Sequence, residues 1–106
     1  MHLLVFSTVS SQEEGERIGQ ELVRARLAAC VNVVPRITSI YEWKGELCRE
    51  TECLLLIKSH RGRFQDLQEK IRQLHSYELP EVIGVEICEG SERYLAWIDE
   101  VMRTPG

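Results

Sequence analysis

Three groups of polar residues in this chain are candidates for chemistry, and no local catalytic motif accompanies them. The groups are the aromatic and charged residues 41–44, the pair Glu52 and Lys58, and the segment 75–81. The sequence has no G-x-S-x-G, no phosphate-binding P-loop, no G-x-G-x-x-G and no H-E-x-x-H. Because these motifs carry nucleophilic, nucleotide and zinc-peptidase chemistry, we expect a protein that is not an enzyme.

Lys58 is the first candidate, since it follows the apolar run 54–57 near the end of an expected buried strand. A desolvated lysine in such a position can bind an anion or act in catalysis. Unpaired buried charge is rare, so the alternative is an ion pair with a nearby carboxylate such as Glu81.

His75 is the candidate metal ligand. It ends a predicted helix, where the helix dipole favours a cationic imidazole, so a structural role is the alternative. Its sequence neighbours Tyr77, Glu78 and Glu81 offer only oxygen, and one histidine with hard oxygens makes a weak transition-metal site. The four cysteines include no C-x-x-C pair, so we expect buried thiols at strand positions rather than a zinc site. They are Cys30, Cys48, Cys53 and Cys88.

The spacing of apolar residues predicts the elements that position these candidates. Ser11 and Glu14 form a capping box for the first helix, and Pro35, which cannot donate to a sheet, marks a bulge in a long strand. The expected order is a strand at 3–6, a helix from 12 to about 26, strands at 28–43 and 47–59, a helix from 64 to about 75, a strand at 82–88 and a last helix between Ser91 and Pro105.

This order predicts one α+β domain over residues 1–106. Right-handed βαβ connections around a central hairpin give the ferredoxin-like arrangement, βαββαβ plus a C-terminal helix, with an antiparallel sheet covered by helices on one face. The other face has no cover within the chain, although 31–34 and 54–57 are apolar on both sides. Self-association is therefore expected. In the last helix, the residues expected to face inward are Tyr94, Leu95, Ile98 and Val101.

The hairpin is too long for a domain of this size. A 15-residue strand spans about 50 Å, whereas a compact chain of this length is about 33 Å across. Its far end must protrude, and it carries Ile37, Ile40, Tyr41 and Trp43, which are unsuited to solvent. We therefore expect another copy of the chain to cover these four residues.

Composition limits the remaining partners. Apolar residues make up 43% and charged residues 28% of the chain, as in ordinary globular proteins. The net charge of -4 argues against nucleic-acid binding, because phosphate binding needs a basic surface. No apolar run approaches the ~20 residues of a membrane span, and residues 1–5 look like a first strand rather than a signal peptide, so no membrane insertion and a cytoplasmic location are expected.

Five segments resemble the CutA divalent-cation-tolerance proteins. They are 27–32 (LAACVN), 38–45 (TSIYEWKG), 56–59 (LIKS), 75–81 (HSYELPE) and 94–97 (YLAW). The resemblance covers nearly the whole chain in order. It implies a ferredoxin-like subunit in a tight homotrimer, similar in architecture to the PII signal-transduction proteins, with the long hairpins crossing between subunits.

The resemblance also implies where ligands would bind. Six residues would line a cleft between subunits, with Cys30 and His75 as metal ligands and Glu52, Lys58, Tyr77 and Glu81 as further ligand-binding groups. The chain departs from the bacterial pattern at Ser7 and Leu74, where relatives can offer a cysteine and a second histidine. A soft copper site of that form is therefore not expected.

The function that this resemblance favours is tolerance of divalent metal ions such as copper, by a cytoplasmic homotrimer that requires no cofactor and binds metal weakly or in the cleft. The alternative is a PII-like sensor whose cleft takes a small anionic ligand beside Lys58, or a protein partner. A hydrolase or an RNA-recognition module can share the fold, but the chain has neither a glycine-rich phosphate loop nor a stacking aromatic pair at 53–59.

Overall fold

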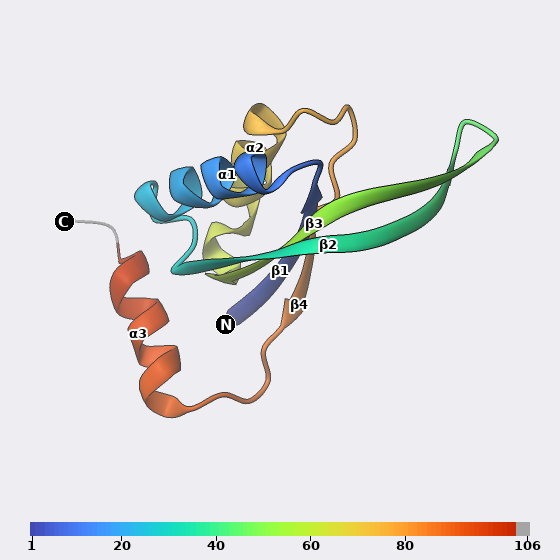
Figure 1. Cartoon of the computed structure of the whole chain (residues 1–106). Helices are drawn as coiled ribbons and strands as arrows, with labels where there is room; N and C mark the ends of the chain where they lie inside the picture. Colours follow the sequence, from blue (N-terminus) through green and yellow to red (C-terminus); the bar gives the residue numbers. More distant parts are fainter. Residues whose placement is uncertain (104–106) are drawn as a thin grey trace.

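The computed structural model describes residues 1–103 and confirms the ferredoxin-like order (Figure 1). Its elements are β1 (His2–Val9), α1 (Gln12–Arg24), β2 (Cys30–Trp43), β3 (Glu46–His60), the short 3₁₀ helix η1 (Arg61–Arg63), α2 (Phe64–Leu74), β4 (Ile83–Glu86) and α3 (Glu92–Met102). The antiparallel sheet has the order β2-β3-β1-β4, so β1 and β3 are central, as the apolar run at 3–6 predicts. No helix in residues 1–103 is long and apolar enough to cross a membrane.

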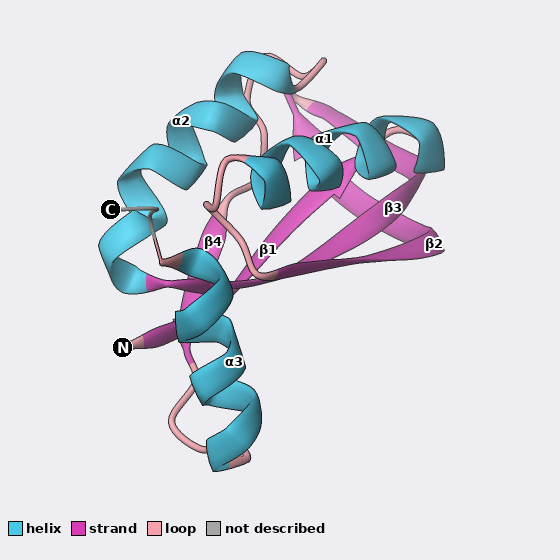
Figure 2. Ribbon diagram, turned by 90° about the vertical axis from the view of Figure 1, so that its left-hand side faces the viewer, coloured by secondary structure: helices cyan, strands magenta, loops and turns pink. Residues whose placement is uncertain are grey.

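Helices α1 and α2 cover one face of the sheet, and α3 lies apart from them (Figure 2). Alternate residues of β1 and β3 are buried beneath the helices, because successive side chains in a strand point to opposite faces. Ile18 and Leu22 of α1 and Leu67 and Ile71 of α2 complete this core and are fully buried. The helix-covered layer thus forms a complete hydrophobic core within one chain.

The opposite face of the sheet, here called the open face, carries apolar side chains with no helix over them. The pairings Phe6↔Leu56, Phe6↔Ile83 and Leu4↔Val85 place these residues on one face, since paired residues in an antiparallel sheet share a side. Ile83 is 53% exposed and Val85 is 43% exposed. This uncovered face matches the expectation from the sequence.

The β2–β3 hairpin stands away from the body of the molecule (Figure 1). The chain measures 47 × 27 × 21 Å along its principal axes, so the hairpin roughly doubles one dimension. The register shifts between Val34 and Ile37, which confirms the bulge predicted at Pro35, and Arg36 adopts a left-handed backbone with φ 59°. Three of the four predicted contact residues, Ile40, Tyr41 and Trp43, are 67%, 41% and 40% exposed.

Three expectations about the C-terminal part were wrong. The strand predicted at 82–88 spans only Ile83–Glu86, because its partner β1 begins at His2, whose carbonyl accepts the last hydrogen bond from Ile87 N–H. Cys88 therefore lies beyond the strand and is exposed, while only Cys53 of the four thiols is buried. Tyr94 is 43% exposed, because α3 buries Ile98 and Met102 against Ala29 on another side.

Candidate functional site

A cavity of about 650 Å³ lies between the hairpin and the loop that follows α2. This cavity, here called the hairpin pocket, contains three of the predicted ligand-binding residues, Glu52, Tyr77 and Glu81. Its charged lining residues are all acidic, and three of its other lining residues are aromatic. The acidic residues are Glu52, Glu78 and Glu81, and the aromatic ones are Tyr41, Trp43 and Tyr77.

Strand register explains why these side chains meet. The pairing Thr8↔Leu54 sets the open face, so Glu52, two residues along β3, points to the same side. Beyond the bulge, Glu52 pairs with Ile37, and Tyr41 therefore also lies on that side. The open face thus continues beyond the bulge, from the body of the sheet onto the hairpin. The loop that follows α2 contributes Tyr77, Glu78, Leu79 and Glu81 to the pocket lining.

Glu52 and Tyr77 form the centre of the hairpin pocket. The Tyr77 hydroxyl donates a hydrogen bond of 2.5 Å to Glu52 Oε2, and Glu52 is only 6% exposed. Burial raises the pKa of the Tyr77 phenol, and the hydrogen bond to Glu52 and the negative charge of this carboxylate raise it further. Within residues 1–103, Glu52 has no cationic partner. The negative charge of Glu52 in this pocket is therefore not balanced by a cation within residues 1–103.

His75 lies next to this pocket, but both of its ring nitrogens are already engaged. Nε2 lies 2.7 Å from the Thr8 carbonyl oxygen, and Nδ1 lies 3.0 Å from Tyr77 N. Because Tyr77 N–H donates to Nδ1, the ring proton belongs on Nε2, which donates to Thr8. A metal at His75 would have to replace one of these two hydrogen bonds. Its side chain is also fully buried, 3.8 Å from Glu14 Oε2.

Cys30 and Lys58 lie at the other end of the open face. They pair across β2 and β3, and both contact Asn32. Lys58 Nζ donates to Asn32 Oδ1, and Cys30 Sγ lies 3.9 Å from the same oxygen. The expected alternative of an ion pair between Lys58 and Glu81 is not found among residues 1–103. Six positions along β3 separate Lys58 from Glu52, which corresponds to about 20 Å.

One chain therefore divides the six predicted residues into two groups. Glu52, Tyr77, Glu81 and His75 gather around the hairpin base, whereas Cys30 and Lys58 lie near the start of β2. In the part of the chain that the structure describes, no three His, Cys, Asp or Glu side chains form a ready-made metal site. The residues present thus fit a metal only if a second copy brings further ligands.

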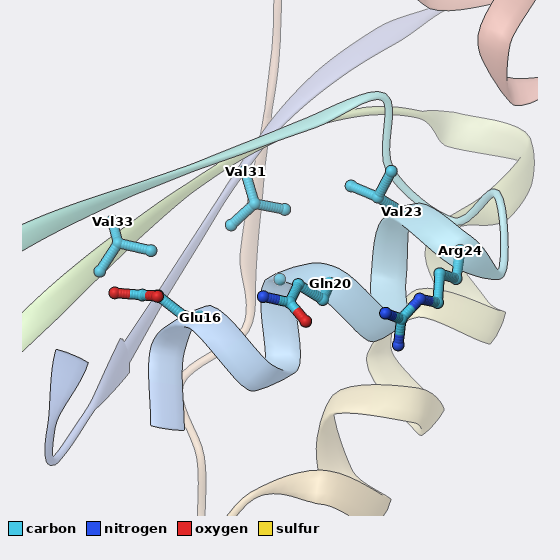
Figure 3. Close-up of a pocket in the computed structure, with 7 residues that line it drawn as sticks. Glu16, Gln20, Val23, Arg24, Val31 and Val33 are labelled. Atoms are coloured by element: carbon cyan, nitrogen blue, oxygen red, sulfur yellow. The ribbon is translucent and has the colours of Figure 1, made fainter. Parts of the chain in front are cut away.

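A second hollow of about 420 Å³ lies between α1 and β2 (Figure 3). Val31 and Val33 point from β2 toward the Gln20 and Glu16 side of α1. It is shallower than the hairpin pocket and contains none of the six predicted site residues.

Sequence reasoning missed three residues that support the site. Asn32 holds Lys58, and Thr8 holds His75 through its carbonyl oxygen. Glu14, expected only as a helix cap, also accepts a hydrogen bond of 2.9 Å from Ser76 N. Its carboxylate thus ties α1 to the loop that follows α2. These contacts join segments 26 to 67 residues apart, so local sequence spacing carries no signal of them.

The sequence matches a family model described as "CutA1 divalent ion tolerance protein" over residues 3–101. This chain belongs to the CutA family. The divalent-cation tolerance protein CutA of Thermus thermophilus is 45% identical over 100 residues, covering 94% of this chain and 97% of that protein. The CutA proteins are not known as enzymes, in agreement with the sequence prediction.

Solved CutA structures have the same fold. The Thermus thermophilus structure superposes with a TM-score of 0.89, covering 92% of this chain and 94% of that one. The CutA described as periplasmic from Archaeoglobus fulgidus is 35% identical, has a TM-score of 0.94 and covers 97% of this chain and 100% of its own.

CutA relatives differ in length and in location. The chloroplastic CutA of Arabidopsis thaliana is 40% identical over 95% of this chain, but this chain spans only 56% of that protein. The names of these relatives place one in the chloroplast and another in the periplasm, so the cytoplasmic location of this chain stays a prediction.

Proposed function

We propose that this CutA chain acts in tolerance of divalent cations as a cytoplasmic homotrimer, with a cation-binding cleft that is completed where two copies meet. The observation that carries the proposal is the hairpin pocket, whose charged lining residues are all carboxylates. Such a lining attracts cations and repels anions. The names of the relatives, which describe divalent-cation tolerance, support the same reading.

The proposed trimer rests on two surfaces that one chain leaves uncovered. The open face exposes Ile83 and Val85, and the hairpin exposes Ile40, Tyr41 and Trp43. Contiguous apolar patches of this kind mark interaction sites in proteins. A cyclic arrangement packs different patches of one subunit against the next, so it can cover both surfaces. Ile37, at the base of the protruding hairpin, belongs to the same proposed contact.

Six residues are proposed to line the completed cleft, and they differ in the metal they suit. Carboxylates such as Glu52 and Glu81 and the Tyr77 hydroxyl suit hard cations, whereas Cys30 and His75 suit copper or zinc. Lys58 would reach the cleft from the end of the sheet opposite to Glu52. A bound metal would supply positive charge to the buried Glu52 carboxylate.

Calorimetric titration of the assembled protein with Cu(II), Zn(II) and Cd(II) tests the metal proposal. We expect at least one ion to bind more tightly than ~100 μM, and both Cys30→Ser and Glu52→Gln to weaken that binding. The metal affinity of His75→Gln shows whether His75 is a metal ligand or a structural residue, because Gln can keep one hydrogen bond without offering an imidazole. Binding of no ion more tightly than this limit would count against the metal site, whatever the oligomeric state.

The PII-like alternative retains one specific observation in its favour. Lys58 is hydrogen-bonded only to the neutral Asn32 side chain among residues 1–103, so its charge is available to an anion. Thermal-shift measurements with nucleotides and organic acids test this reading, since a ligand at 100 times its dissociation constant stabilises the fold by about 2.7 kcal/mol. A shift that Lys58→Met abolishes would favour the sensor; no shift from any anion would rule against it.

A further inference from the structure

The hairpin pocket of a single chain has room for a ligand larger than a bare metal ion. Its volume of about 650 Å³ lies within the range of small-molecule sites, which run from roughly 300 to 1,000 Å³. A metal ion needs several oxygen ligands at about 2.0–2.6 Å, and no three acidic, histidine or cysteine side chains of residues 1–103 converge in that way. The remaining space would stay unfilled around an ion.

Glu52 supplies a buried negative charge that has no cationic partner among residues 1–103. Its side chain lines the pocket and is 6% exposed, and among residues 1–103 its one hydrogen-bond partner is the neutral Tyr77 hydroxyl. Buried charges in proteins are normally paired with an opposite charge or a metal, because desolvation of an unpaired ion is costly. A cation that enters the pocket would meet a carboxylate already fixed in place by its hydrogen bond.

The two phenols that line the pocket, Tyr41 and Tyr77, stay protonated. Partial burial raises the pKa of Tyr41, and nearby acidic groups, including Glu52, raise it further. Burial likewise raises the pKa of Tyr77, together with its hydrogen bond to Glu52. Both phenols therefore stay neutral and keep their hydroxyl groups as polar contacts. An anionic ligand would be repelled at this end of the open face.

The aromatic side chains that line the pocket provide a second means of recognising a cationic ligand. Trp43 and Tyr41 line the pocket and are 40% and 41% exposed in a single chain. Aromatic faces attract ammonium and guanidinium groups, and tryptophan does so most strongly. The chain itself gives an example at the hairpin tip, where Lys44 Nζ lies 5.7 Å from the centroid of the Trp43 ring.

We propose that the hairpin pocket binds a small organic cation, whose primary ammonium or guanidinium group pairs with Glu52 and whose carbon skeleton packs on Tyr41 and Trp43. The exposed carboxylates Glu78 and Glu81 lie at the same pocket and favour a second positive charge, so diamines and polyamines should bind better than monoamines. The proposal goes beyond the proposed function, because it assigns a second kind of cation to a pocket that the metal proposal also uses, and it rests on the assembly only in that a neighbouring copy closes the pocket.

Titration of the assembled protein with butylammonium, putrescine, spermidine and agmatine tests the proposal, with butyrate as the anionic control. Calorimetry measures affinity, and Trp43 fluorescence in a Trp97→Phe background reports occupancy of the pocket itself. We expect saturable binding of the amines, strongest for the di- and polycations, and none of butyrate. Glu52→Gln should weaken binding by about tenfold or more, as expected for losing a charge-assisted pair.

Glu50→Gln is the matched control, because Glu50 lies on the same strand but does not line the pocket. Because Glu50 pairs with Ser39 and its charge still acts on Tyr41, we expect a small loss of affinity, well below that of Glu52→Gln. Equal losses from Glu50→Gln and Glu52→Gln would show only general charge attraction and would overturn the proposal. So would the absence of amine binding to the wild-type assembly.

Lys58→Met tests a competing occupant of the pocket, the Lys58 side chain of a neighbouring copy. Amine binding that appears only after this substitution would show that the neighbouring lysine occupies the cation position beside Glu52, and the free-ligand proposal would be wrong. Amine binding that is the same in the wild type and in Lys58→Met supports the proposal. Metal titration and molecular mass are measured on the same samples, so failure of the proposed metal site or trimer is seen separately.

Discussion

Two serine hydroxyls are completely buried on the helix-covered side of the sheet, and they differ in their hydrogen bonding. Ser59 Oγ donates a hydrogen bond of 2.7 Å to the Leu27 carbonyl oxygen. Ser7 Oγ finds no partner among the described residues. A buried polar group without a partner costs roughly 1–3 kcal/mol, whereas a satisfied hydrogen bond stabilises by about 1 kcal/mol. The two positions should therefore respond to alanine in opposite ways.

We expect Ser7→Ala to leave the free energy of unfolding unchanged or raise it by up to about 1 kcal/mol, and Ser59→Ala to lower it by about 1 kcal/mol or more. Urea unfolding at one fixed protomer concentration measures both, because stability depends on concentration in an oligomer. Equal destabilisation by the two substitutions would mean that Ser7 has an unseen partner. The weak hydrogen bonding of a thiol suits such a position, which fits the cysteine expected there from the resemblance.

At the scale of elements, the Glu14 carboxylate joins the start of α1 to the loop that carries Tyr77 and Glu81. Glu14 Oε1 accepts from Ser10 Oγ at 2.9 Å, and Oε2 accepts from Ser76 N at 2.9 Å. Burial raises the pKa of Glu14, but the hydrogen bonds from Ser76 and Ser10 outweigh it and hold the pKa below the ordinary value of 4.5. The contact therefore stabilises the fold only while Glu14 is ionised.

Glu14→Gln is expected to lower the free energy of unfolding at pH 7 by about 1–2 kcal/mol, because the amide can accept at only one of its two ends. Since the folded pKa is lowered, the contribution is complete above the unfolded pKa and is lost as the pH falls through the folded value. The difference between wild type and variant should thus shrink below about pH 4.5. Glu13→Gln is the control, because Glu13 lies in the same first turn of α1 but is exposed, and it should change stability by less than about 0.5 kcal/mol.

The elements also show how far the sequence could lead. Apolar alternation, the Ser11 cap and Pro35 predict strands, helix and bulge because each is a local signal. In contrast, the Glu14–Ser76 contact joins residues 62 positions apart, and no local pattern encodes it. The end of β4 depends on where β1 begins, because the last hydrogen bond between them runs from Ile87 N–H to the His2 carbonyl and Cys88 lies beyond it.

At the scale of the whole molecule, the open face determines whether one chain can form the predicted cleft without a partner. Its apolar residues continue from the body of the sheet toward the hairpin pocket, so a partner that covers one also approaches the other. This continuity explains why the six residues of the predicted cleft fall into two groups within one chain. Local sequence pattern shows that the face is apolar, but only the register shows that Lys58 and Glu52 lie at opposite ends of it.

Substitutions at two valines with the same exposure can test whether the open face is covered in the assembly. Val85 on the open face and Val23 on α1 are both 43% exposed. If a copy of the chain covers the open face, Val85→Glu places a charge in a buried interface and also removes roughly 1.5–3 kcal/mol of apolar burial per subunit. Light scattering at micromolar concentration should then give the 12.3 kDa mass of one chain for Val85→Glu, and three times that mass for wild type and Val23→Glu. Retention of the wild-type mass by Val85→Glu would show that the partner does not cover this face, and the hairpin alone would have to hold the assembly together.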